Sequence, residues 1–177
     1  MSAETEPMVH GTLMAGFAQA CINLNIVAGR RGSDLLADVD VSRWYPLPRW
    51  IALEQTIGAT YLYCDAIILK VGIEMMTQWY HRGPGRDVIR RGADFLPFQT
   101  DSTGMASVIR GPKAMVGSFD LQKFDPQAGR AVIHSTTPFN RKMECGVLIG
   151  GLLAPGDIDY VDVTNDADPD LLHVEFH

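Results

Sequence analysis

The sequence predicts an α+β fold: an N-terminal helical lobe is followed by a four-stranded antiparallel sheet. Two observations carry this prediction. Apolar residues recur at helical spacing through the first part of the chain, and near its end two pairs of alternating runs flank one amphipathic segment. The order of the last part is therefore hairpin, helix, hairpin, with the helix across one face of the sheet.

The first hairpin pairs residues 118–124 with 130–136. Pro126 fixes a φ angle that suits a turn, and Gly129 tolerates the positive φ that a tight turn requires. The second hairpin pairs residues 158–163 with 171–176 around a polar turn at 165–170. Between the hairpins, residues 139–153 carry an apolar stripe at helical spacing, which predicts a helix.

Helical spacing also predicts six helices before the sheet. They run over residues 11–28, from Ser33 or Asp34 to Val39, from Pro48 through Tyr61, from Asp65 through Trp79, over 87–95 and over 105–115. Gly29 is the expected C-cap of the first, and Pro48 suits the first turn of the third. The last of the six is interrupted by Gly111 and Pro112.

The 177 residues suit one domain, with a disordered tail at 1–7 and a single domain at 8–177. Within it we expect a helical lobe at 8–117 and a sheet lobe at 118–177. A net charge of -6, without a Lys/Arg cluster longer than a pair, argues against nucleic acid as a partner. The acidic start is unlike a signal peptide, and no apolar run reaches the roughly 18 residues of a membrane span. We therefore expect a cytoplasmic protein.

Residue types that carry chemistry are scattered. The three cysteines lie far apart in apolar runs, which favours buried thiols over disulfides or zinc ligands. The five histidines form no metal-binding spacing, and no serine lies in a nucleophile motif. The sequence thus predicts no metal site, no catalytic residues and no enzymatic activity.

Two features favour a ligand pocket. The helical part is rich in aromatic residues and methionine. Core packing accounts for most of them, and those left over could form an apolar pocket between the helices and the sheet, a usual place for a small ligand. Gly146 and Gly150 lie four residues apart on one helix face, which permits close approach of either another helix or a ligand.

Several local sequences resemble the heme nitric oxide/oxygen binding (H-NOX) domain and its heme-free relatives, which include the 4-vinyl-reductase-type ligand-binding domain. The resemblance covers residues 10–176. It is carried by the segments His10-Gly11-Thr12-Leu13, Val71-Gly72 with Trp79-Tyr80, Arg90-Arg91 with Phe95-Leu96, and Arg141-Lys142-Met143. It implies an H-NOX-like fold and a signalling role, as in bacterial regulators of this architecture.

The resemblance also locates the positions that bind heme in the family. The histidine that coordinates iron falls at or near Thr103, and no histidine occurs between His81 and His134. The Tyr-x-Ser-x-Arg motif that holds the heme propionates is matched by residues 137–141, of which only Arg141 agrees. Imidazole is a far better iron ligand than a hydroxyl group, so we expect no heme and no other cofactor.

The positions matching the family's gas-side pocket are apolar or small. With Phe95 from the aromatic set, the expected ligand-pocket residues are Leu13, Phe17, Ile68, Met75, Phe95, Gly146 and Gly150. Such a pocket suits a small hydrophobic molecule.

Three functions are compatible with these observations. The leading hypothesis is a non-catalytic, heme-free cytoplasmic sensor or adaptor that binds a small apolar ligand or a signalling protein. The second is a gas sensor that binds heme or another tetrapyrrole through an unexpected ligand, such as His134 or Cys145. The third is a homodimeric interaction module that uses Trp44, Tyr45, Trp50 or the sheet edge.

Overall fold

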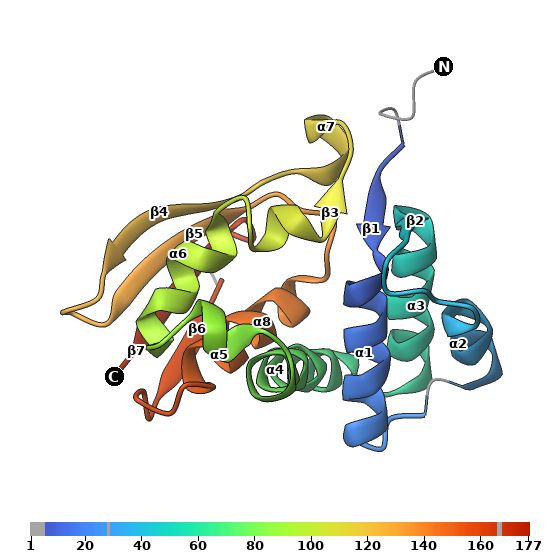
Figure 1. Ribbon diagram of the computed structural model, residues 1–177, viewed down its shortest axis with the longest axis horizontal. Helices are drawn as coiled ribbons and strands as arrows, with labels where there is room; N and C mark the ends of the chain where they lie inside the picture. Colours follow the sequence, from blue (N-terminus) through green and yellow to red (C-terminus); the bar gives the residue numbers. More distant parts are fainter. Residues whose placement is uncertain (1–5, 28, 166–167) are drawn as a thin grey trace.

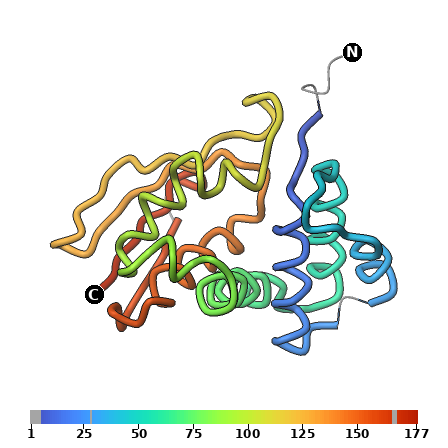
Figure 2. The backbone as a smooth tube through the Cα atoms, viewed as in Figure 1, coloured from blue at the N-terminus to red at the C-terminus, as the bar shows by residue number. Residues whose placement is uncertain are grey.

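A long central helix, α4 (Cys64–Arg82), lies between a helical lobe and a sheet lobe (Figure 1). The structure is a computed structural model that describes residues 6–27, 29–165 and 168–177. Figure 2 shows the chain leaving the helical lobe through α4, returning to it at residues 109–110 and then staying in the sheet lobe. One continuous apolar core runs through both lobes. Among the described residues, no helix combines the length and apolar character needed to cross a membrane.

The helical lobe packs three helices beside a small antiparallel sheet that the sequence did not predict. The helices are α1 (Gly11–Asn23), α2 (Gly29–Leu36) and α3 (Leu47–Thr60). The sheet has the order β2-β1-β3, with β1 (Met8–His10), β2 (Trp44–Pro46) and β3 (Ile109–Arg110). Its strands are too short to show an alternating pattern in the sequence.

The first helix ends earlier than predicted. Asn25 takes a left-handed conformation with φ 55°, and the backbone N–H of Ile26 donates to the carbonyl of Cys21 at 2.8 Å. This arrangement is a Schellman C-cap with Asn in the position that Gly usually fills. Gly29, the predicted cap, instead begins α2 with φ 64°. At the chain start, residues 1–5 of the expected tail lie outside the described residues, whereas Pro7 is buried and its carbonyl accepts from Leu47.

The segment between α4 and the sheet lobe differs most from prediction. Instead of helices at 87–95 and 105–115, it contains short elements: α5 (Gly85–Val88), η1 (Gly92–Asp94), α6 (Phe95–Thr100), η2 (Met105–Ser107), β3 and α7 (Lys113–Val116). Gly92 lies so close to the end of α8 that a Cβ there would overlap the carbonyl oxygen of Leu152. This tertiary contact interrupts the helix that local spacing suggested.

The sheet lobe confirms the predicted hairpin, helix, hairpin order. Its elements are β4 (Phe119–Asp125), β5 (Arg130–Ser135), α8 (Arg141–Leu153), β6 (Val161–Thr164) and β7 (Leu171–Phe176). The antiparallel sheet has the order β4-β5-β7-β6, and α8 lies across one face (Figure 1). Gly129 adopts φ 63° in the first turn. The strand β6 begins three residues later than predicted, and positions 166 and 167 of the second turn lie outside the described residues.

The two lobes meet where α4 crosses α8 without side chains between the backbones. A Cβ added at Gly146 would overlap the carbonyl oxygen of Leu69, and one at Gly150 would lie 2.5 Å from the carbonyl oxygen of Ile73. On the facing helix, a Cβ at Gly72 would lie 2.9 Å from the backbone nitrogen of Val147. Three glycines therefore set the separation of the two helices.

This crossing predicts opposite effects for two glycine substitutions. Gly146→Ala should lower the free energy of unfolding by about 2 kcal/mol, because the new methyl group meets backbone that cannot move independently. Gly58→Ala in α3 is the matched control, since its Cβ would meet nothing closer than 3.9 Å. That control should raise stability by up to about 1 kcal/mol through helix propensity. Urea unfolding measures both changes, and equal effects would contradict the role of the crossing.

Candidate functional site

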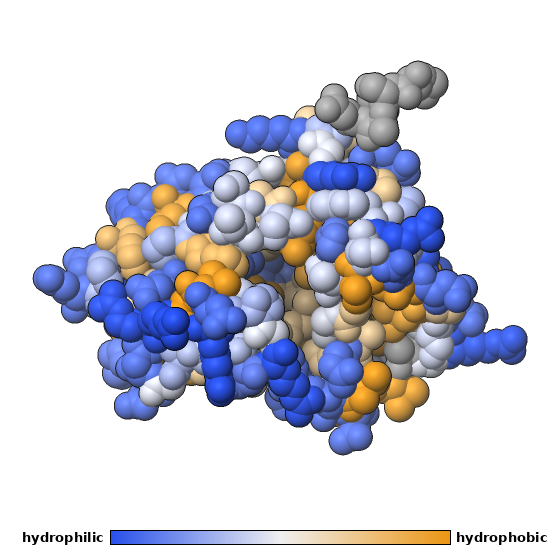
Figure 3. Space-filling model, viewed as in Figure 1, coloured by the Kyte–Doolittle hydropathy of each residue, from blue (hydrophilic) through white to orange (hydrophobic). Residues whose placement is uncertain are grey.

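A cleft of about 990 Å³ opens between the helices α1 and α4 and the segment of residues 83–108. The helices α1 and α4 line one side, and α5, α6 and η2 line the other. Its apolar walls are formed mainly by Leu13, Met75, Met76, Trp79, Phe98 and Val108. Figure 3 shows the hollow near the centre of the molecule, with apolar surface inside it and hydrophilic side chains along its lower edge. Its size and its walls suit a small-molecule site.

The cleft continues inward as a smaller chamber of about 130 Å³. Leu13, Met75, Trp79 and Phe98 line both spaces, so the chamber is the inner end of the cleft. Beyond them, the chamber is closed by residues at the start of α8, which are Phe139, Met143, Glu144 and Val147. The inner end therefore belongs to the sheet lobe.

The central helix supplies most of one wall because of its periodicity. Gly72, Met75, Met76 and Trp79 recur at intervals of three or four residues and so share one face of α4. The same face touches α8 at Gly72 and opens into the cleft one turn later. The ring of Trp79 stacks on Phe98 of α6, with centroids 5.2 Å apart and planes 21° apart, which holds the aromatic wall in place.

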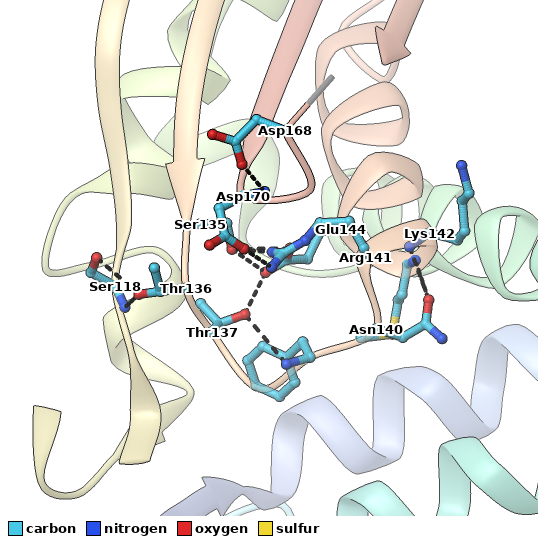
Figure 4. Close-up of polar contacts among 12 residues, drawn as sticks. Ser118, Ser135, Thr136, Thr137, Asn140, Arg141, Lys142, Glu144, Asp168 and Asp170 are labelled. Atoms are coloured by element: carbon cyan, nitrogen blue, oxygen red, sulfur yellow. Dashed lines mark hydrogen bonds and ion pairs between the residues drawn. The ribbon is translucent and has the colours of Figure 1, made fainter. Parts of the chain in front are cut away.

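The one charged side chain among the described residues of the inner chamber is Glu144, which is 1% exposed. Its carboxylate accepts hydrogen bonds from the hydroxyls of Ser135, at 2.9 and 3.0 Å, and Thr137, at 2.5 Å. The Arg141 guanidinium completes the cluster by an ion pair to Glu144, and also reaches Asp170 at 3.4 Å (Figure 4). The cluster arises where β5 ends and α8 begins.

The donors around Glu144 are matched to a carboxylate. Burial raises the pKa of Glu144, and the hydroxyl of Thr137 and the charge of Arg141 oppose that rise. Because all three neighbours donate, the ionised form has the better partners. Asn140 caps α8 just before this cluster, with its side-chain oxygen 2.9 Å from the backbone nitrogen of Lys142.

A second buried carboxyl, Glu54 of α3, lies where the helical lobe meets the start of α8. It is 8% exposed, and one oxygen accepts from the backbone N–H of Asn140 at the long distance of 3.4 Å. Burial raises the pKa of Glu54 to about 8. Glu54 therefore carries a proton near neutral pH and lies at the lobe contact as a neutral group.

The structure brings together only part of the residue set expected to line the pocket. Leu13 and Met75 line both the cleft and the chamber. Three residues are fully or almost fully buried in the core outside the described lining, namely Phe17, Ile68 and Phe95. Gly146 and Gly150 lie in the crossing with α4, where helix packing explains them. The sequence analysis missed Trp79, Phe98 and Glu144 as lining residues.

The residues at the family's heme-binding positions lie near the cleft with different partners. Thr103 lines both spaces, and its hydroxyl donates to Asp101 at 2.6 Å. Arg141 is occupied by the Glu144 cluster. In the described lining of the two spaces there is no His, Cys or Tyr, and within the described chain no group of three or more His, Cys, Asp or Glu could hold a metal ion.

Residues assigned to the alternative functions lie away from the cleft. His134 alternates on β5 with the buried Ile133 and Ser135 and so lies on the opposite face of the sheet from them. Cys145 is buried in α8, and burial raises its pKa. Of the residues expected at a dimer surface, Trp50 and Tyr45 are buried in the core, so these two were wrongly placed there, whereas Trp44 is half-buried.

The buried proton of Glu54 predicts a pH-dependent stability. The unfolded chain loses this proton near the ordinary pKa of 4.5, whereas the folded chain holds it up to about pH 8. The contribution of Glu54 to stability should therefore be greatest below the lower value and fall by about 1.4 kcal/mol per pH unit between the two. Glu54→Gln should remove this slope, while Glu175→Gln on the exposed side of β7 should keep it. Urea unfolding across the window tests this, and a pH-independent difference between wild type and Glu54→Gln would contradict it.

Comparisons with known proteins identify the fold. Neither the models of known protein families nor the curated protein sequences gave a match. An H-NOX protein from S. oneidensis in the Fe(II)NO state is similar, with a TM-score of 0.65 and 11% sequence identity, and the match covers 95% of this chain and 99% of that one. An Fe(II) unliganded H-NOX protein from K. algicida has a TM-score of 0.65 and 8% identity, with 95% of this chain and 96% of that one covered. An oxygen-binding H-NOX domain related to soluble guanylate cyclases has a TM-score of 0.62 and 12% identity, with 94% of each chain covered. At these identities the likeness shows that this chain has the H-NOX fold.

Proposed function

We propose that this chain is a non-catalytic sensor or adaptor that binds a small apolar ligand in the cleft, without heme, and passes the state of the cleft to a partner protein. The observation that carries the proposal is the cleft itself. It is apolar, holds about 990 Å³, and adjoins a chamber that the start of α8 closes, so a molecule that fills both spaces contacts the helical lobe and the sheet lobe. A ligand that fits one arrangement of the lobes better than another shifts their equilibrium.

The residues in the cleft support a site that does not bind heme in the manner of the fold's relatives. The similar S. oneidensis H-NOX structure is in the Fe(II)NO state, and the H-NOX domain related to soluble guanylate cyclases is an oxygen complex. Here the hydroxyl of Thr103 stands where the resemblance places an imidazole, and it is already bonded to Asp101. The retained Arg141 is paired with Glu144, so it is not free for a propionate.

The composition of the cleft also supports a binding role over catalysis. Its described lining offers hydroxyl, amide and thioether groups, the guanidinium of Arg82 and the carboxylate of Glu144, whose oxygens are bonded within its own cluster, but no pairing of nucleophile and base. The three cysteines are thiols in the structure, which fits a reducing compartment such as the cytoplasm.

A second candidate function is homodimerisation through an apolar surface at the end of the helical lobe. Ile22, Val27, Leu62 and Tyr63 are 67%, 68%, 98% and 81% exposed. The hydroxyl of Tyr61 bonds the backbone of Val27, so two of the segments that carry these residues are adjacent. Light scattering tests this candidate: a strict monomer at tens of micromolar would reject it.

Filling the cleft should abolish ligand binding. Leu13→Trp places a large side chain where the cleft enters the chamber, and it should weaken binding of the apolar dye Nile red by at least about tenfold. Lys70→Trp on the exposed part of α4 is the matched control and should leave the affinity unchanged. A fluorescence titration measures both, and undiminished binding by Leu13→Trp would locate the dye elsewhere.

The heme-free part of the proposal has a separate test. The purified chain mixed with hemin and passed through a desalting column should retain no stoichiometric heme, because the cleft lining has no imidazole, thiolate or phenolate ligand. The visible spectrum reports the result. A Soret band at one heme per chain would refute this part.

A further inference from the structure

The charges of the cleft are distributed unequally between its two ends. At the mouth, the only charged residue in the described lining is Arg82, the last residue of α4. At the inner end, the only charged residue in the described lining is Glu144. Apolar residues separate the two, so the cleft has a cationic mouth and an anionic inner wall.

The inner end offers no free cation to a ligand. The guanidinium of Arg141 lies beside the chamber, but it is bound by Glu144, by the Ser135 hydroxyl and by Asp170. Both oxygens of Glu144 are bonded within the cluster. An acidic group at this end would be desolvated without a partner and would face a carboxylate, and both effects oppose binding.

The mouth offers the opposite environment. Arg82 is exposed, and none of the ion pairs within the described part of the chain involves it. Arg86, which follows one turn of chain later, is held by the ring of Tyr80 and by His81. Arg82 is thus available to an acidic group at the entrance, where an arginine can form a bidentate pair with a carboxylate.

The walls between the two ends suit an extended apolar body. Met75 and Met76 are flexible side chains that adapt to irregular shapes, and Trp79 with Phe98 provides a flat aromatic surface. The cleft and the chamber share Met75, Met76 and Phe98 as walls, so an apolar tail that passes Met75 would reach the start of α8.

We propose that the ligand is an amphipathic monoanion, an apolar chain or ring system with one acidic head, bound with its head at Arg82 and its apolar end in the chamber beside Glu144. This inference rests on the proposed function and specifies the ligand class and its orientation. Arg82 determines affinity for the head, and Glu144 selects against a second acidic group.

A basic residue in the last turn of a helix also stabilises the helix dipole, which gives Arg82 a simpler role. The two roles differ in what they predict. A helix-end role makes Arg82→Gln lower the thermal midpoint and leaves the relative affinities of charged and neutral ligands unchanged. If Arg82 instead binds the acidic head group, Arg82→Gln changes the ratio of the affinities for charged and neutral ligands.

The experiment is a calorimetric titration of the full chain with dodecanoic acid, dodecanol and dodecanedioic acid. Wild type should bind the acid about tenfold more tightly than the alcohol, and the diacid more weakly than the acid. Arg82→Gln should lose about tenfold in affinity for the acid and keep its affinity for the alcohol. Arg90→Gln, an exposed arginine outside the described cleft lining, should match wild type.

The outcomes separate this inference from the function on which it rests. Equal affinities of wild type for acid and alcohol would overturn the inference and leave a cleft that binds neutral ligands. An equal loss for both ligands in Arg82→Gln would also overturn it. Diacid binding as tight as that of the acid would refute the selection by Glu144, and binding of none of the three would refute the ligand cleft itself.

Discussion

The close crossing of α4 and α8 is the constraint on which the rest of the structure depends. Gly72, Gly146 and Gly150 let the two backbones touch, which fixes the lobes to each other along one side. Further along α4, the same helix face no longer meets α8, and Met75 with Trp79 borders open space instead. A cleft exists because the lobes are fixed at one side only. A wider crossing would separate α8 from the chamber that its first residues close.

Two buried carboxyl groups lie near this junction, and the structure lowers the free-energy cost of burying each of them in a different way. Glu144 is surrounded by two hydroxyls and a guanidinium, which oppose the rise in its pKa that burial causes, whereas Glu54 has one long hydrogen bond and holds a proton. Burying an unpaired charge costs several kcal/mol, so proton binding is the less costly state for Glu54. Glu54 therefore adds no charge at the lobe contact, and the charged residues in the described lining are Arg82 at the mouth of the cleft and Glu144 at its inner end.

The sheet lobe was predictable because its signals are local, whereas the site was predictable only in part. Pro126, Gly129 and alternating runs specify the first hairpin within a few residues. The three-stranded sheet instead joins strands of two or three residues from distant parts of the chain, and no local pattern encodes such pairing. Of the residues expected to line the pocket, Phe17 and Ile68 are packed in the core and Met75 borders the cleft, because apolar positions at helical spacing do not distinguish a core from a cavity wall. One available signal was missed: Glu144 is the only acidic residue in an otherwise apolar, glycine-rich helix, three residues after Arg141.

The lobes are in close contact at the crossing of α4 and α8 and in looser contact elsewhere. This difference determines how a ligand in the cleft can affect the relative position of the lobes. Away from the crossing, the lobes meet through the Trp50 and Phe139 rings, 5.7 Å apart, and through the 3.4 Å hydrogen bond between Asn140 and Glu54. Neither contact resists a small rotation as strongly as two touching helix backbones do. A ligand between α1 and α6 lies beside α4, on the side of that helix away from its contact with α8. Its contacts with both lobes can therefore bias their relative position, and α4, which belongs to the cleft and to the crossing, transmits the change.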